Sequence, residues 1–266
     1  METKTITLKQ IAEQIDHHQT SGTDMDKVTI QSPELSVKDA YEIQQLWEQC
    51  AIKRGDQKIG WKMGLTSVAK QRSVGVNEPI YGRLTNSMEV TSNTLSLKGL
   101  IHPRVEPEIA FVMKEELKGE QLTARDVWKA TEFIMPAVEV IDSRYKNFSF
   151  TLIDVVADNA SSSRFFLSDQ AFSPFQSSLD KLEVIMYRNG EKVQSGFGSA
   201  VLGHPVKSVI ELAKMLHQVG LSIQPGMVIL TGGITEAVNV FDGDELKVTF
   251  DSFGEINFDV KKEKED

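Results

Sequence analysis

Apolar side chains in the first part of the chain recur at the three- and four-residue spacing of amphipathic helices. This spacing covers residues 6–19 and 37–54. Ser36 precedes the second stretch as a favourable N-cap, and Gly55 follows it as a favourable C-terminal stop. The pattern therefore predicts a small helical N-terminal portion over residues 1–57.

From about Lys58 the pattern changes to short apolar runs interrupted by Gly, Pro and Asn, which is typical of strands. In one of these runs, Asn189-Gly190 lies between strand-like flanks and predicts a β-hairpin. The predicted strand segments are KIGWKMGLT, HPRVEPEIAFVMK, IMPAVEVIDSR, LEVIMYRNGEKV, GMVILTGG and DELKVTFDSFGEINFDV. We therefore expect the chain after Lys58 to be mostly sheet.

Two helices are predicted to interrupt this sheet. The first covers residues 123–134, and the second covers residues 205–220, with Pro205 in its first turn and Gly220 as its stop. Strands and helices do not alternate regularly along the chain, and no internal repeat is visible. The sequence therefore predicts an α+β fold with a large mixed sheet in a β-rich domain over residues 58–266, rather than a doubly wound parallel fold.

The composition narrows the class of protein. The 266-residue chain has a formal net charge of −9, which disfavours a nucleic-acid-binding surface. No apolar run approaches the ~18 residues of a membrane span. Because the N-terminal residues lack the pattern of a secretory signal, we expect a cytoplasmic protein. Cys50 is the only cysteine, which excludes an intrachain disulfide.

Three glutamates lie in segments that otherwise favour burial. Glu106 and Glu108 are two residues apart in the predicted strand RVEPEIAFVM, so their side chains point to the same face. Glu139 lies between Val138 and Val140, where an unpaired charge would be costly. A hard divalent cation such as Mg²⁺, which prefers oxygen ligands, would hold three such carboxylates together. The alternative is a solvent-exposed strand face that carries Glu106 and Glu108.

Lys62 lies between Gly60 and Gly64 in the segment GWKMGLTS. The glycines would let the backbone approach a ligand, and the apolar neighbours Trp61 and Met63 would lower the pKa of the lysine towards a value suited to proton transfer. The alternative is an ordinary lysine whose ammonium reaches solvent.

Polar residues are concentrated between apolar runs from residue 142 to residue 164. This segment forms either a loop over a pocket or a turn whose Asp and Asn side chains bond to their own backbone. Its polar members include Asp142, Arg144, Asp158, Asn159, Ser161, Ser162, Ser163 and Arg164. A second such place is TGGI at residues 231–234, which forms either a tight turn or a row of backbone N–H donors for an anion.

Seven motifs resemble, in their order, the hydratase/decarboxylase branch of the fumarylacetoacetate hydrolase superfamily. They are GWKMGLTSVAK, NEPIYG, HPRVEPEIAFV, PAVEVIDSRYKNFSF, VVADNASSSRF, AVLGHP and PGMVILTGGIT, and the match covers residues 58–250. The resemblance implies a mixed β-roll of the C-terminal-domain type of this superfamily, with flanking helices. It also implies Mg²⁺ or Mn²⁺ on Glu106, Glu108 and Glu139, the same residues that their burial and charge single out.

The resemblance also implies roles for individual residues. Lys62 would lie beside the metal and either contact the developing oxyanion or donate a proton, with Ser161 and Arg144 as further catalytic residues. Arg144 and Arg164 are the nearby cations that could receive a substrate carboxylate, and structural roles for both are the alternative. The expected substrate-binding residues are Leu65, Asp158, Asn159, Ser161 and Thr231.

Within this branch the sequence is more similar to the decarboxylases of 4-oxalocrotonate (2-oxo-3-hexenedioate) than to the 2-oxopent-4-enoate hydratases. The features that favour the decarboxylases are SRYKNFSF after Glu139, the form ADNASSSRF, and Ile80 at a position where hydratases usually carry aspartate. The implied reaction is metal-dependent decarboxylation of this 2-oxo dicarboxylate to 2-hydroxypenta-2,4-dienoate in aromatic meta-cleavage catabolism. The alternatives are the hydratase reaction and a non-catalytic subunit that scaffolds the hydratase. The family also implies a homo-oligomer and a complex with that hydratase.

Overall fold

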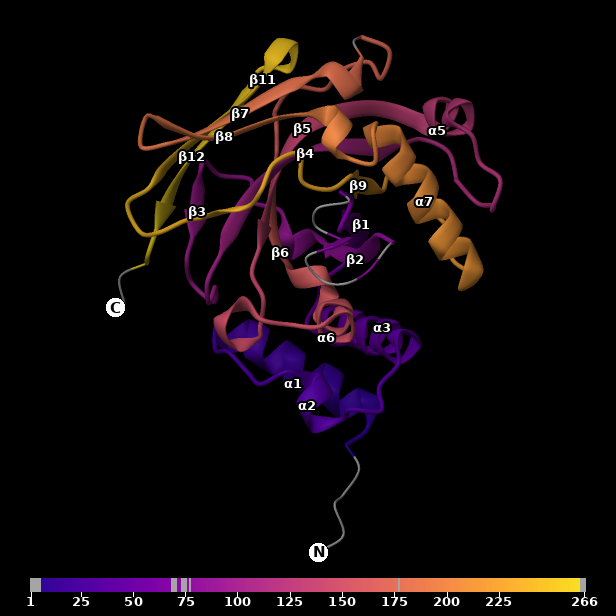
Figure 1. Cartoon of the computed structure of the whole chain (residues 1–266), viewed down its shortest axis with the longest axis vertical. Helices are drawn as coiled ribbons and strands as arrows, with labels where there is room; N and C mark the ends of the chain where they lie inside the picture. Colours follow the sequence, from indigo (N-terminus) through magenta and orange to yellow (C-terminus); the bar gives the residue numbers. More distant parts are fainter. Residues whose placement is uncertain (1–5, 68–70, 73–75, 77, 177, 264–266) are drawn as a thin grey trace, which may run out of the picture.

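The computed structural model describes residues 6–67, 71–72, 76, 78–176 and 178–263. Two β-sheets, a group of N-terminal helices and three later helices make up the regular structure of this part of the chain (Figure 1). Strands and helices do not alternate regularly, so the predicted α+β class is confirmed. Residues 68–70 of the motif GWKMGLTSVAK and Asn77 of NEPIYG lie outside the described residues.

The larger sheet has seven strands among the described residues, in the order β2-β1-β9-β4-β5-β6, with β10 paired to β4. β1 and β9 are parallel, whereas the other neighbours are antiparallel, so the predicted mixed sheet is confirmed. The strands are β1 (Lys58–Gly64), β2 (Ile80–Thr85), β4 (Arg104–Met113), β5 (Thr131–Ile141), β6 (Ser162–Leu167), β9 (Val228–Leu230) and β10 (Val238–Asn239).

The smaller sheet has five strands in the described ranges, in the order β3-β12-β11-β7-β8. Asn189 and Gly190 join β7 to β8 with φ angles of 55° and 81°, as the usual two-residue hairpin turn requires. The predicted hairpin is therefore confirmed. The strands are β3 (Thr94–Ser96), β7 (Glu183–Arg188), β8 (Glu191–Phe197), β11 (Glu245–Phe250) and β12 (Glu255–Lys261).

The helices form two groups. α1, α2, α3 and α6 lie together at the end of the molecule that carries the N-terminus, and α5 and α7 lie beside the sheets (Figure 1). Ser36 caps α3 as predicted, because its hydroxyl accepts a hydrogen bond from Asp39 N. The helices are α1 (Leu8–Ser21), α2 (Val28–Gln31), α3 (Val37–Lys53), α5 (Ala124–Ala130), α6 (Leu152–Ala157) and α7 (Pro205–Gln218).

The helix predicted over residues 123–134 is wrong in its last four residues. α5 ends at Ala130, and β5 begins at Thr131. From there the chain pairs with β4, and this pairing outweighs the local helical spacing of the apolar residues. The polar segment predicted as a loop also contains two regular elements, α6 and β6. A capping box formed by Thr151 and Asp154 starts α6.

The two faces of the larger sheet pack against different layers. One face packs against the smaller sheet and α7, through residues that include Phe111. The other face packs against α1, α3 and α6, through residues that include Ala110 and Ala137. Side chains alternate between the faces of a strand, so Glu108 and Glu139 point to the same side as these alanines. The predicted metal ligands therefore lie between the larger sheet and the helices.

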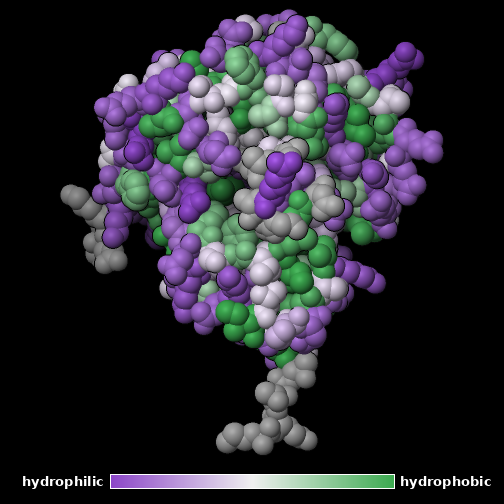
Figure 2. All heavy atoms as spheres, in the orientation of Figure 1, coloured by the Kyte–Doolittle hydropathy of each residue, from purple (hydrophilic) through white to green (hydrophobic). Residues whose placement is uncertain are grey.

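Hydrophilic side chains cover most of the face seen in Figure 2, and hydrophobic ones line a hollow near its middle. Large exposed apolar side chains, such as Ile30, Phe175 and Phe241, belong to different parts of the chain. Within the described ranges, no helix is both long enough and apolar enough to cross a membrane.

Asp154 joins the N-terminal helices to α6. Its carboxylate accepts hydrogen bonds from N and Oγ1 of Thr29 (3.0 Å each) and from N and Oγ1 of Thr151 (2.8 Å each). Asp154→Ala leaves these partly buried donors without acceptors and should lower the free energy of unfolding by about 2–4 kcal/mol in urea titrations. Asp126→Ala is the matched control, since it breaks an exposed capping box with Thr123 and should cost about 1 kcal/mol. Equal losses would contradict the joining role.

Candidate functional site

Three glutamates meet on the helical face of the larger sheet. β4 carries Glu106 and Glu108, and β5 carries Glu139 directly opposite Glu106 in the antiparallel register. One carboxylate oxygen from each residue lies within 4.8 Å of the others, and all three side chains are buried. The exposed-face alternative for Glu106 and Glu108 is therefore wrong.

Without a cation, this cluster is electrostatically unfavourable. Burial raises the pKa of Glu108 well above its usual value, and the charges of Glu139 and Glu106 raise it further. Burial also raises the pKa of Glu139, although the neighbouring Lys62 ammonium opposes the shift. Buried like charges at this spacing require either protonation or a further cation.

The donor set fits a hard divalent cation. Oε2 of Glu108 accepts a hydrogen bond from Gly232 N (2.7 Å), whereas its Oε1 is buried and has no hydrogen-bond partner in the described part of the chain. Mg²⁺ prefers carboxylate oxygens and usually keeps positions for water or substrate, and Mn²⁺ takes the same kind of ligand. Glu106, Glu108 and Glu139 are therefore the residues that could hold such an ion.

Lys62 places an ammonium directly beside these carboxylates. Its Nζ lies 3.1 Å from Glu139 Oε2 and donates a hydrogen bond to Ala160 O (3.0 Å), and the side chain is only 2% exposed. Gly82 lies opposite Lys62 on β2 and leaves room for its stem, because a Cβ there would lie 3.1 Å from Lys62 Cγ and Cδ. The alternative of an ordinary solvated lysine is therefore wrong.

The chain between α6 and β6 turns sharply beside Lys62. Asn159, Ala160 and Ser161 have φ angles of 51°, 52° and 56°, a left-handed backbone that is uncommon for non-glycine residues. Such conformations cost free energy and cluster at functional sites. Ser161 Oγ is buried and has no hydrogen-bond partner among the described residues, so this hydroxyl is available to a ligand.

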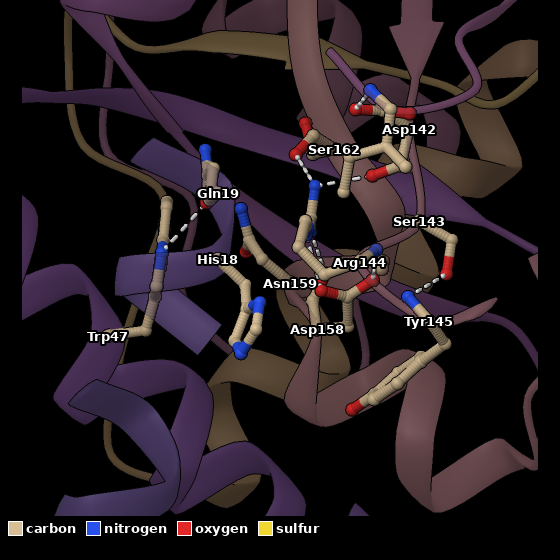
Figure 3. A network of polar contacts seen from close by, with 12 residues as sticks. His18, Gln19, Trp47, Asp142, Ser143, Arg144, Tyr145, Asp158, Asn159 and Ser162 are labelled. Carbon is tan, nitrogen blue, oxygen red and sulfur yellow. Dashed lines mark hydrogen bonds and ion pairs between the residues drawn. The ribbon is translucent and has the colours of Figure 1, made fainter. Parts of the chain in front are cut away.

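Arg144 is enclosed by the loop that the sequence singled out (Figure 3). Its Nε donates to Asp158 Oδ1 (2.5 Å), its Nη1 donates to Asp142 O (2.5 Å) and Ser162 O (3.1 Å), and its Nη2 donates to Asp158 O. The side chain is 1% exposed. These contacts favour the structural alternative for Arg144 and also engage Asp158. A direct contact of either residue with substrate stays a prediction.

The turn after β9 lies against the same carboxylates. Thr231 is buried, and its hydroxyl donates to Ile109 O (2.8 Å). Gly232 has a φ of 107°, and a Cβ there would lie 2.2 Å from Thr66 Oγ1, so only glycine fits this close approach. Thr66, which the sequence analysis missed, has a buried hydroxyl without a hydrogen-bond partner in the described chain. Substrate contacts of Thr231 and of the half-buried Leu65 stay predictions.

Carboxylates, an ammonium and hydroxyls that have no partner among the described residues are buried around one point on a mixed sheet. Such a site suits an enzyme that uses a metal ion and an anionic substrate. The chain belongs to the fumarylacetoacetate hydrolase family, because residues 61–261 match the family model described as "Fumarylacetoacetate (FAA) hydrolase C-terminal". The resemblance in the motifs and the fold that it implies are therefore confirmed.

Relatives with known activities include both decarboxylases and hydratases. The chain is 45% identical over 253 residues to 4-oxalocrotonate decarboxylase from Pseudomonas sp. (strain CF600), covering 93% of this chain and 95% of that protein. It is 38% identical over 230 residues to 2-hydroxyhexa-2,4-dienoate hydratase from Comamonas testosteroni, covering 85% and 87%. The solved structure of 4-oxalocrotonate decarboxylase from Pseudomonas putida G7, complexed with magnesium and adipate, matches with a TM-score of 0.93 and 42% identity, covering 97% of this chain and 100% of that chain.

We expect the buried carboxylates to make the protein less stable in EDTA as the pH rises. Because the pKa values of Glu108 and Glu139 are raised in the folded state, folding favours their protonated forms. Their contribution to stability is therefore fully present below the usual glutamate value of 4.5 and is lost as the pH rises through the raised values. Thermal unfolding in EDTA should give a lower Tm at about pH 8 than at about pH 5.5, and Mg²⁺ should raise the Tm more at the higher pH.

Glu108→Gln isolates this effect, because it removes one negative charge and keeps an acceptor for Gly232 N. We expect it to raise the Tm in EDTA at about pH 8 by about 2–4 °C, and to weaken the stabilisation by Mg²⁺. Glu132→Gln, at an exposed position of β5, is the control and should change neither quantity. A Glu108→Gln variant that is less stable than the wild type in EDTA would contradict the expected repulsion.

Proposed function

We propose that the protein catalyses the metal-dependent decarboxylation of 4-oxalocrotonate (2-oxo-3-hexenedioate) to 2-hydroxypenta-2,4-dienoate and CO₂. The observation that carries this proposal is the Lys62 ammonium, 3.1 Å from Glu139 within a buried cluster of three carboxylates. The 45% identity to a 4-oxalocrotonate decarboxylase over 93% of the chain supports the substrate class. The protein is thus a carboxy-lyase, and we place it in aromatic meta-cleavage catabolism.

The proposed substrate carries its own electron sink. When the C5–C6 bond breaks, its electron pair moves through the C3–C4 double bond to the 2-oxo oxygen, and CO₂ leaves. The dienol product then needs a proton on that oxygen and none on carbon. The protein must therefore orient the substrate, stabilise charge on one oxygen and exclude water.

We propose that the metal binds at the carboxylate cluster. Glu106, Glu108 and Glu139 would hold Mg²⁺ or Mn²⁺, and a relative that is 42% identical is complexed with magnesium in its solved structure. When bound, the ion would supply a Lewis acid for the oxygen that takes up the electron pair.

Lys62 supplies a second positive charge from the chain itself. Its ammonium is fixed by Glu139 Oε2 and by Ala160 O. An ammonium has three N–H donors, so these contacts leave a further donor for a ligand. We propose that this N–H contacts the developing oxyanion or delivers its proton. Because the site is buried, either role stabilises the oxygen more strongly than it would in water.

The nearby arginines do not offer a clamp for the leaving carboxylate. Arg144 donates to Asp158 and to main-chain carbonyls of its own loop. Arg164 lies opposite Val140, whose side chain packs towards the smaller sheet, so it points away from the glutamates. A cation on the leaving carboxylate would stabilise the substrate and oppose loss of CO₂. We therefore propose that this carboxylate binds without an arginine partner.

The two alternatives have less support. The hydratase relative is 38% identical, compared with 45% for the decarboxylase, so hydration is not favoured. A non-catalytic scaffold would not need Glu106, Glu108, Glu139 and Lys62 in one buried cluster, which is costly without a cation.

We also propose a cytoplasmic homo-oligomer that forms a complex with a 2-oxopent-4-enoate hydratase. This part of the proposal rests on the family resemblance and on chemistry, because the dienol that decarboxylation releases is the enol form of the hydratase substrate. Light scattering on the purified protein, alone and with such a hydratase, tests both assemblies.

We expect the purified protein with Mg²⁺ to release CO₂ from 4-oxalocrotonate. Glu139→Gln should lower kcat/KM at least about a hundredfold, since it removes a proposed metal ligand and the partner of Lys62. Glu132→Gln, on an exposed part of the same strand, should keep the wild-type rate. CO₂ release measures the reaction, and circular dichroism checks that both variants are folded.

Full activity of Glu139→Gln in the presence of EDTA would refute this assignment. Addition of water to 2-oxopent-4-enoate, without CO₂ release from 4-oxalocrotonate, would assign the hydratase function instead. Neither reaction in a protein that still binds Mg²⁺ would favour the scaffold.

Lys62→Met should lower kcat by about 10²–10³-fold, because it removes the ammonium beside the developing oxyanion. Binding of Mn²⁺, followed by calorimetry, should stay within about threefold of the wild type, since the three carboxylates remain. Lys58→Met is the control, because the Lys58 amine lies over the Trp61 ring and pairs with Glu48 (3.4 Å), which is not one of the three glutamates of the cluster. A wild-type kcat in Lys62→Met would show that this ammonium has no part in the reaction.

A further inference from the structure

The Asn159 side chain binds the main chain of a neighbouring strand. Its Oδ1 accepts a hydrogen bond from Arg83 N (2.7 Å), and its Nδ2 donates one to Arg83 O (2.9 Å). Arg83 lies on β2 next to Gly82, which is directly opposite Lys62. The Asn159 side chain is fully buried. Its amide therefore faces the main chain of Arg83, to which both of its polar atoms bond, and not a ligand.

Asn159 also begins the left-handed turn beside the site. Asparagine tolerates this backbone better than most residues, whereas Ala160 and Ser161 have no such preference. Arg144 holds both ends of the turn, because its guanidinium donates to the carbonyl of Asp158, just before the turn, and to that of Ser162, just after it. The surrounding contacts therefore maintain a backbone that would otherwise relax.

This turn supplies one of the two contacts that fix the Lys62 ammonium, and Glu139 supplies the other. Ala160 O accepts the hydrogen bond from Lys62 Nζ (3.0 Å), and Ser161 follows with a hydroxyl that has no partner in the described part of the chain. The turn lies directly against β2, since a Cβ on Gly82 would lie 2.7 Å from Asn159 O. A displacement of the turn would therefore move the carbonyl that fixes Lys62.

We infer that Asn159 is a positioning residue, which acts through Ala160 O on Lys62 and makes no contact with the substrate. The inference rests on the function proposed above for Lys62. It replaces the substrate contact that the sequence predicts for Asn159, because both polar atoms of this side chain bond to Arg83. Misplacing a catalytic group by about 1 Å can cost about a hundredfold in rate.

Asn159→Gly tests the inference without adding backbone strain, because glycine adopts the left-handed conformation freely. The kcat should fall about 10–100-fold, while KM and the affinity for Mn²⁺ stay within about twofold of the wild type. A raised KM or weaker inhibition by the dicarboxylate adipate, with kcat unchanged, would reveal a substrate contact and overturn the inference.

Asn189→Gly is the matched control in the β7–β8 hairpin. Asn189 has a φ of 55°, and its side chain donates to Asp244 Oδ1 and accepts from Glu245 N, each at 2.8 Å. The control thus loses a similar pair of hydrogen bonds from a similar backbone, and it should leave kcat unchanged. If Asn159→Gly and Asn189→Gly change kcat equally, Asn159 has only a structural role and the inference is wrong.

A double-mutant cycle tests the route through Lys62. In a Lys62→Met background, Asn159→Gly should cause no further loss of rate, whereas multiplicative losses would overturn the inference.

A second measurement does not depend on activity. In ¹⁵N-lysine-labelled protein, the Nζ resonance of Lys62, assigned by its loss in Lys62→Met, should shift in Asn159→Gly and not in Asn189→Gly. If the wild type does not decarboxylate 4-oxalocrotonate, the proposed function fails, and an unchanged resonance separately refutes the contact-mediated link.

Discussion

The burial of three carboxylates around one point, with the Lys62 ammonium beside them, is the constraint on which the site depends. The cluster is unfavourable without a cation, because burial and mutual repulsion raise the pKa of Glu108, and burial outweighs the effect of Lys62 on Glu139. The same arrangement gives a bound ion strong ligands in a place of low dielectric. The cost in stability and the capacity to bind a metal therefore have one physical origin.

The larger sheet keeps this cluster in place. Glu106 and Glu139 are cross-strand partners in β4 and β5, so their separation is fixed by main-chain hydrogen bonds rather than by a flexible loop. Glycines at 82 and 232 let the neighbouring chain approach the site more closely than any side chain would allow. The helices α1, α3 and α6 then cover this face and separate it from solvent.

The predictable parts of the site are those that local pattern determines. Strand alternation placed Glu106 and Glu108 together, and apolar flanks distinguished Glu139, whereas the register that brings the strands together is a long-range property. The contacts of Arg144 could not be predicted, because most of its acceptors are main-chain carbonyls that any residue type provides. The error at Thr131 also has a long-range cause, because pairing with β4 overrides the helical pattern of the local sequence.

Decarboxylation and hydration in this family share a dienol, so the groups around Lys62 must separate the two reactions. Ile80 lies opposite Gly64, and its Cδ1 and the Lys62 Nζ lie 3.6 and 3.7 Å from the place that a Cβ at Gly64 would take. The family resemblance implies that hydratases of this branch carry aspartate at the Ile80 position. A carboxylate at this position would place a charged, water-binding group on the Gly64 side of the site, near the Lys62 ammonium. A buried isoleucine keeps the same place apolar, which favours the reaction that needs a proton on oxygen and no water at carbon.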